Sequence, residues 1–164
     1  MAKVSNKANK SIKKEVVFKR LAENRYARFQ YEILDTIEAG IELLGTEVKS
    51  IRNSNVNLRD GYCSFRDGEI LLLNVHISPH KNVGSFFNHD PLRNRKLLLH
   101  KKEIIRLKSD SEKKGLTIIP LSIYLKGSRI KLTIGIGKGK KLHDKRQSDK
   151  QKDIRREIKT ALKR

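Results

Sequence analysis

The sequence LTIIPLSIYLKGSRIKLTIGIGK, residues 116–138, predicts a β-hairpin that decides the fold. Apolar side chains occupy every second position of residues 129–138, so one face of this strand is expected in the core and the other, with Lys131, outside it. Gly127-Ser128 supplies a tight turn between the two strands. Pro120 cannot donate a backbone hydrogen bond, so it predicts a bulge or a sheet edge in the first strand.

The chain before this hairpin carries further strand and turn signals. Asp67-Gly68 is typical of a two-residue hairpin turn. The other expected strands are residues 31–44, as a strand pair bent at Gly40, and residues 61–66, 69–77 and 97–99. Helices are expected from Thr46, as the capping residue, to residue 53, and over residues 101–114, ended by Gly115. The pattern predicts a mainly β fold: a small closed OB-like barrel of about six strands with two or three short helices.

Charge is concentrated at the two ends of the chain. The sequence holds 38 Lys+Arg against 18 Asp+Glu, a formal net charge of +20. Residues 1–28 contribute +7 and residues 138–164 contribute +8, so these two segments hold three quarters of the excess. The positive electrostatic field of such a chain favours a polyanionic partner, most often a nucleic acid.

The pattern divides the 164 residues into three parts. Residues 1–20 are expected to be a basic, mostly disordered extension, residues 21–138 an RNA-binding barrel, and residues 139–164 a basic tail that becomes helical on a partner. Apolar runs long enough to cross a membrane are absent, and the basic start is not followed by a signal-peptide core. We expect a cytoplasmic monomer.

The residues that could carry chemistry form no convincing constellation. The single cysteine, Cys63, lies within an expected strand, as a small core residue would. His89-Asp90 is better explained by a turn held by Asp90 than by a catalytic pair. The carboxylates that could ligate Mg²⁺ are Asp60, Asp67, Glu69 and Asp90, which stand among excess Lys and Arg. We expect no metal, no cofactor and no catalytic residue, and a binding protein rather than an enzyme.

Aromatic residues make up only 5% of the chain, and tryptophan is absent. Proteins that bind single strands use aromatic side chains as stacking platforms. Their scarcity favours recognition of a folded RNA through its shape, phosphates and 2′-hydroxyl groups.

Six motifs, in order along residues 23–164, resemble the family of bacterial SsrA-binding proteins (small protein B, SmpB). They are Asn24-Arg25 with Ala27-Arg28, Glu38-Ala39-Gly40-Ile41, Gly45-Thr46-Glu47-Val48-Lys49-Ser50, Asn88-His89-Asp90-Pro91, Arg95-Lys96-Leu97-Leu98-Leu99-His100, and Gly139-Lys140-Lys141 with His143-Asp144-Lys145-Arg146. The extended N-terminus and the chain after Gln147 match the family pattern only loosely.

The resemblance implies an OB-like barrel that binds the tRNA-like domain of transfer-messenger RNA (tmRNA) at its elbow and D-loop. With elongation factor Tu, the complex enters ribosomes stalled on messenger RNA that lacks a stop codon. The protein then occupies the place of a tRNA anticodon arm, and the nascent peptide is tagged for proteolysis, which is the process of trans-translation.

The resemblance also implies roles for individual residues. On the tmRNA-binding surface it places Asn24, Arg25, Glu38, Leu98 and Lys131. At the decoding centre of 16S rRNA it places Gly139, Lys140, Lys141, His143, Asp144, Lys145 and Arg146. The tail beyond them is implied to form a helix in the empty mRNA channel. From alternation alone, Lys131 lies outside the core, whereas Leu98 suits the core and the surface equally.

Two other functions fit the composition. A ribosomal protein that binds rRNA with basic tails would be present at about one copy per ribosome, whereas an adaptor would be scarcer and would co-purify with one small RNA. A third possibility is a nuclease or RNA-modifying enzyme. This hypothesis would be supported by an activity on RNA that depends on residues such as His89 and Asp90.

Overall fold

The hairpin at residues 116–138 is confirmed. β8 (Thr117–Lys126) and β9 (Arg129–Gly139) pair antiparallel. Gly127 has a φ of +62°, the left-handed conformation that the first position of a type II′ turn requires. The pairing shifts register between Pro120 and Ser122, so the bulge predicted from the proline is present.

The computed structural model describes residues 18–81, 84, 88–141 and 158. Most of the expected N-terminal extension and of the expected tail therefore lies outside the described residues. In the described part, the remaining elements are β1 (Phe18–Glu23), α1 (Arg25–Gln30), β2 (Tyr31–Ile41), α2 (Gly45–Arg52), β3 (Val56–Asn57), β4 (Tyr62–Arg66), β5 (Glu69–Leu73), β6 (His76–Ile77), β7 (Arg95–Leu98) and α3 (Lys101–Lys114). β1 begins at Phe18, so the last three residues assigned to the extension belong to the sheet.

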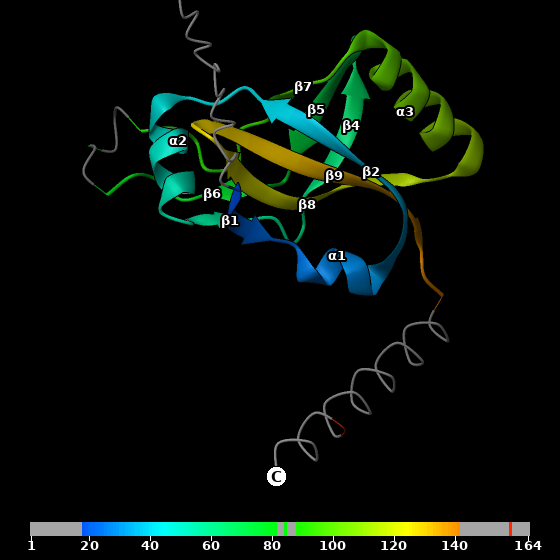
Figure 1. Ribbon diagram of the computed structural model, residues 1–164. Coiled ribbons are helices and arrows are strands. Elements are labelled where there is room, and N and C mark those ends of the chain that lie inside the picture. Colours follow the sequence, from blue (N-terminus) through cyan, green and yellow to red (C-terminus); the bar gives the residue numbers. More distant parts are fainter. Residues whose placement is uncertain (1–17, 82–83, 85–87, 142–157, 159–164) are drawn as a thin grey trace, which may run out of the picture.

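Six strands pair in a closed ring, in the order β8-β4-β5-β7-β2-β9 and back to β8 (Figure 1). β1 lies outside this ring and pairs with Ser122–Lys126 of β8, while β4 meets β8 at Ile118, on the other side of the bulge. The expected mainly β fold of about six ring strands with short helices is confirmed.

The strand pair expected over residues 31–44 is wrong, because β2 is one continuous strand of 11 residues. The bulge in the pairing of β2 with β9 lies between Ile33 and Asp35 and not at Gly40, where a bend was predicted. Gly40 pairs with Lys131 of β9 on one side and with Leu98 of β7 on the other. A Cβ at this position would lie 3.1 Å from the Leu98 Cβ, so glycine allows β7 to approach closely.

Two other boundaries differ from the sequence expectation. α2 begins at Gly45, and its first turn is capped by the Glu47 carboxylate, which accepts from the Leu44 backbone N–H at 2.7 Å, rather than by Thr46. The expected strand 69–77 is divided, since Asn74 adopts a φ of +55° and ends the pairing of β5. β6 then pairs with β3 in a small separate sheet.

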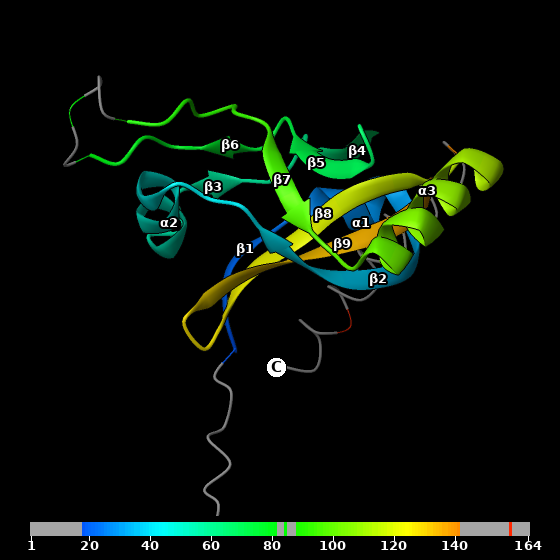
Figure 2. The ribbon, with the colours of Figure 1, turned by 90° about the horizontal axis from the view of Figure 1, so that it is seen from above.

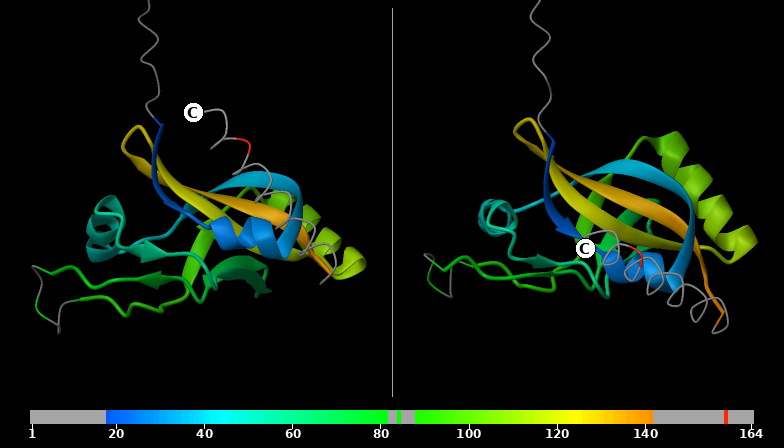
Figure 3. Two further views of the ribbon diagram at one scale, coloured as in Figure 1. Left: turned by 90° about the horizontal axis from the view of Figure 1, so that it is seen from below. Right: turned by 60° about the horizontal axis from the view of Figure 1, so that its bottom comes forward.

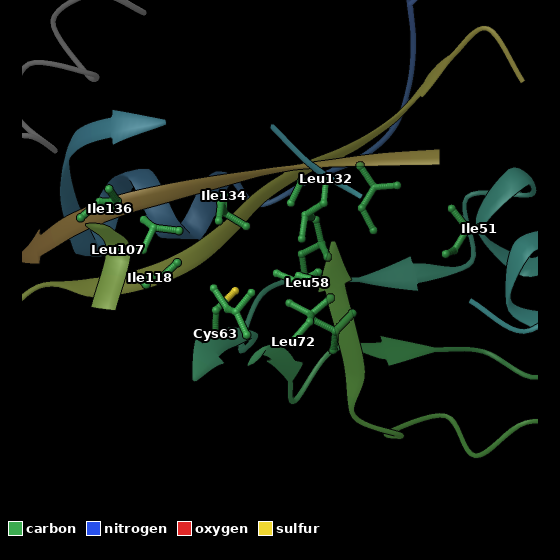
Figure 4. Packing of buried hydrophobic residues seen from close by; sticks show 14 of the residues in the cluster. Ile51, Leu58, Cys63, Leu72, Leu107, Ile118, Leu132, Ile134 and Ile136 are labelled. Atoms are coloured by element: carbon green, nitrogen blue, oxygen red, sulfur yellow. The ribbon is translucent and has the colours of Figure 1, made fainter. Parts of the chain in front are cut away.

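The main core fills the ring and reaches α2 and α3. Leu107 of α3 is fully buried and lies beside Ile118 and Ile136, and Ile51 brings α2 into the same cluster (Figure 4). α2 and α3 stand at opposite ends of the ring (Figure 2). Gly115, with a φ of +57°, ends α3 as predicted.

A second, smaller core was not expected. Ala27 of α1 packs with Ile119 and Leu121 of β8 on the outside of the ring (Figure 3). Alternation placed Gly135 and Gly137 of β9 on a solvent-facing side, but both are buried beneath this cluster. A Cβ at Gly135 would lie 2.7 Å from Leu121 Cδ1, so this close packing requires glycine.

Candidate nucleic-acid interface

The solvent-facing side of five neighbouring strands forms one continuous surface, which we name the outer face. β1, β8, β9, β2 and β7 follow one another across it (Figure 1). Because side chains alternate along each strand, the strand register fixes which ones share this side. The members are Phe18, Arg20, Ser122, Tyr124, Lys126, Arg129, Lys131, Thr133, Glu38, Gly40 and Leu98. One row crosses all five strands: Arg20, Tyr124, Lys131, Gly40 and Leu98.

Leu98 belongs to the surface, which decides the alternative that the sequence left open. Leu98 is 53% exposed, whereas its neighbour Leu97 is buried in the core. Leu98 and Lys131 line two adjoining hollows, one extending toward α3 and the other toward α2. An exposed leucine beside a lysine offers apolar contact and positive charge at one point.

Glu38 is held on the outer face by two neighbours. The Tyr124 hydroxyl donates to its carboxylate, and Lys126 Nζ lies 3.0 and 3.1 Å from its two oxygens. The hydrogen bonds from Tyr124 and Lys126 lower the pKa of Glu38. Burial and the bond to Glu38 raise the pKa of Tyr124 to about 12. At neutral pH the pair is therefore a carboxylate and a neutral phenol, and the fixed carboxylate can accept from base amino groups or 2′-hydroxyls.

The basic residues of this surface differ in how far they are neutralised. Lys126 pairs with Glu38, and Arg20 pairs with Glu23 at 3.2 Å. Within the described residues, Lys131 and Arg129 form no ion pair with a side chain. Lys131 is half-buried and lines the same hollow as Leu98 and Glu38. A lysine that has no ion pair among the described residues is suited to bind a phosphate.

The comparisons with known proteins identify the family. The sequence matches the SmpB protein family over residues 21–164. The chain belongs to the SmpB family. An SsrA-binding protein of Prochlorococcus marinus (strain MIT 9515) is 91% identical over 164 residues, which cover 100% of this chain and 99% of that protein. An SsrA-binding protein of Prochlorococcus marinus (strain MIT 9303) is 61% identical over 162 residues, or 99% and 98% of the two chains.

A solved structure agrees in sequence and fold. A chain from the structure reported as "tmRNA-SmpB: a journey to the center of the bacterial ribosome" is 49% identical and superimposes with a TM-score of 0.62. The match covers 82% of this chain and 94% of that one.

Among the SmpB-family residues expected on the RNA surface, Asn24 lies inside the fold. It is 3% exposed, and its amide donates to the Leu58 and Pro120 carbonyls at 2.7 and 3.1 Å. Its Oδ1 caps α1 by accepting from the Ala27 backbone N–H at 2.9 Å. Asn24 therefore positions α1. Arg25, next to it, has a side chain that is 90% exposed.

The start of the tail is hydrogen-bonded to α1. Gly139 ends β9, and the Lys140 backbone N–H donates to the Gln30 carbonyl at 2.9 Å. Lys140 Nζ also donates to the Arg28 carbonyl at 3.2 Å. Lys141 is exposed. The other residues expected at the decoding centre, His143, Asp144, Lys145 and Arg146, lie outside the described residues.

Three of the SmpB-family motifs meet in a buried ionic cluster that the sequence did not reveal. Arg95 and Glu47 are fully buried, with Arg95 Nε donating to Glu47 Oε1 at 2.8 Å. Arg95 also donates to the Val75 and Pro91 carbonyls at 2.6 and 3.0 Å. Arg93 Nη2 donates to the other Glu47 oxygen at 2.8 Å. The cluster ties α2 to β7, and its role is to hold these elements together.

His89 and its neighbour serve the same region. The buried His89 ring lies 2.9 Å from the Thr46 hydroxyl and 3.1 Å from the Ile77 carbonyl. Asp90 accepts from the Leu92 backbone N–H at 3.0 Å, which confirms the expected turn. Burial raises the pKa of the Cys63 thiol well above its usual range, so this thiol stays protonated.

In the part of the chain that the structure describes, no group of three or more His, Cys, Asp or Glu residues is placed to hold a metal ion. In the same residues, no helix is both long enough and apolar enough to cross a membrane.

Proposed function

We propose that this protein binds tmRNA on its outer face and carries it to stalled ribosomes for trans-translation. Relatives that are 61–91% identical are named SsrA-binding proteins, and a homologous chain is described together with tmRNA and the bacterial ribosome. The net charge of +20 suits an RNA partner.

The observation that carries this proposal is that Leu98 and Lys131 flank Gly40 in one row of the outer face. A leucine that is 53% exposed stands beside a lysine that has no ion pair among the described residues, with the fixed Glu38 carboxylate in the adjacent row. This combination offers apolar, cationic and acceptor contacts to a folded RNA. Leu98, Glu38 and Lys131 would contact tmRNA directly, Arg25 would reach it from the edge, and Asn24 would act by positioning α1.

The protein has two working parts in this proposal. Residues 21–138 hold the tRNA-like domain, and residues 139–164 act at the decoding centre of 16S rRNA and in the empty mRNA channel. Lys140 is fastened to α1, so the tail would start from a fixed point on the body. Elongation factor Tu would join through tmRNA. The protein supplies binding and positioning, and the chemistry of tagging belongs to the ribosome.

Affinity purification from cells, followed by sequencing and counting of the bound RNA, tests the proposal. We expect one small RNA, tmRNA, at about one copy per protein, and fewer protein copies than ribosomes. Recovery with rRNA alone, at about one copy per ribosome, would instead indicate a ribosomal protein.

A further inference from the structure

A second feature of the outer face lies at its edge, where β1 pairs with β8. A hollow there is lined by Phe18 and Arg20 of β1, by Ser122 and Tyr124 of β8, and by Thr133 of β9. Tyr124 also donates to Glu38, so the hollow is continuous with the surface that carries Leu98 and Lys131.

The strand register explains why these residues meet. Phe18 pairs with Lys126, and Arg20 pairs with Tyr124. The register shifts between Arg20 and Ala22, so the intervening Leu21 turns into the core. Phe18 and Arg20 consequently remain together on the outer face, two residues apart on one strand.

The exposure of Phe18 is what needs an explanation. Phe18 is 61% exposed, although burial of an aromatic ring away from water stabilises a protein. The Tyr124 ring is 5.9 Å away at an interplanar angle of 44°, and Lys126 Nζ lies 6.0 Å from the Phe18 ring centroid. These two contacts orient the ring and leave most of its surface open.

The hollow combines the groups that recognise an unpaired nucleotide. An open aromatic ring can stack on a base, and every base offers a π face. Arg20 is paired with Glu23 and Lys126 with Glu38, but the Arg20 side chain is 65% exposed, and its remaining guanidinium N–H groups can donate to a phosphate. The Ser122 hydroxyl can donate to or accept from a base edge, whereas the Tyr124 hydroxyl already donates to Glu38 and can only accept. The charged groups around the hollow disfavour an apolar partner surface, and the net charge of +20 favours RNA.

We propose that this hollow binds one unpaired nucleotide of the RNA held on the outer face, with its base stacked on Phe18. The inference rests on the proposed function, because the nucleotide would belong to tmRNA. It gives Phe18 and Arg20 a role that the six family motifs do not include.

The first test measures the Kd of full-length protein for tmRNA transcribed in vitro. Phe18→Leu keeps an apolar side chain but removes the π face. Loss of one stacked base weakens binding by roughly fivefold to 150-fold. Phe18→Trp should retain or improve the affinity. Ile105→Ala is the matched control, because Ile105 is also 61% exposed but lies on α3, away from the outer face.

The second test uses fluorescence. The natural chain has no tryptophan, so Phe18→Trp introduces a single reporter. Stacking on a base should quench its emission on addition of tmRNA, whereas the emission of Ile105→Trp should stay unchanged. Arg20→Gln should reduce the slope of log K against log salt by about one, because it removes a phosphate contact.

The two proposals fail in different ways. If the natural protein does not bind tmRNA, the proposed function is wrong and the inference falls with it. If the natural protein binds tmRNA while Phe18→Leu binds equally well, or the indole emission of the Phe18→Trp variant is not quenched, only the nucleotide site is wrong. If Phe18→Leu and Ile105→Ala lose equal affinity for tmRNA, the proposed nucleotide site is also wrong.

Discussion

Replacing Lys131 by glutamine should weaken tmRNA binding without weakening the fold. Among the described residues Lys131 has no ion pair, so the change breaks none. We therefore expect the free energy of unfolding to stay within about 0.5 kcal/mol of the natural protein. The expected loss lies in the complex, where one phosphate would lose its cation.

The magnitude follows from counterion release. One phosphate contact contributes about 0.7 to 0.9 to the slope of log K against log salt. Removing it should weaken binding about four- to fivefold at ~0.15 M salt and about eight- to fifteenfold at ~0.05 M salt. Filter binding or fluorescence anisotropy at several salt concentrations gives both the affinity and the slope.

The matched control is Lys108→Gln on α3. Lys108 carries the same charge, its side chain is 54% exposed, and its ionic neighbour Glu112 is 3.9 Å away. We expect little change in Kd for this variant. If Lys108→Gln loses as much affinity as Lys131→Gln, the attraction is diffuse and the outer face is not the contact surface. An unchanged salt slope for Lys131→Gln would refute the phosphate contact itself.

Three further predictions concern the buried cluster, the outer-face carboxylate and the tail. Arg95→Ala should cost about 3–5 kcal/mol of unfolding free energy, because the buried Glu47 keeps only Arg93 as its cation and the Val75 and Pro91 carbonyls lose their donor. The exposed Arg106→Ala should cost under about 1 kcal/mol in the same urea titration, and equal costs would refute this. The pKa of Glu38 is lowered from 4.5, so its contribution to stability should be complete above that pH and fade as the pH falls through the lowered pKa. The stability difference between natural protein and Glu38→Gln, measured from about pH 7 down to about pH 3, should shrink, and a constant difference would contradict the assignment. Deleting residues 147–164 should leave the Kd for tmRNA nearly unchanged but abolish peptide tagging; a large loss of affinity would contradict the two-part division.

The sequence predicted correctly those elements that depend on residues close to one another in the chain. The hairpin at residues 116–138, the Asp67-Gly68 turn and the helix over residues 101–114 were predicted with correct type and nearly correct bounds. In each case the deciding interaction lies within a few residues: a glycine at positive φ, or apolar side chains at a regular period. The strand at residues 31–44 was misjudged because Gly40 suggested a break, whereas it lets one strand pair with two neighbours.

Some residues of the candidate site were predicted correctly and others were not, because their surroundings depend on residues that are distant in the chain. Alternation placed Lys131 outside the core, and the structure places it on the outer face. Leu98 could not be assigned from sequence, since its exposure depends on which strands flank β7. Asn24 was expected on the surface, but its side chain hydrogen-bonds to carbonyls 34 and 96 residues away.

The sequence by itself determined the mainly β class, the basic ends, the motifs of the SmpB family and the turns, because each of these depends on composition or on neighbouring residues. Only the tertiary structure decided that Arg95 and Glu47 form a buried pair, and that Phe18 stands beside Tyr124, 106 positions further along the chain. Contacts between distant positions depend on how the ring closes, and ring closure is a property of all six strands together.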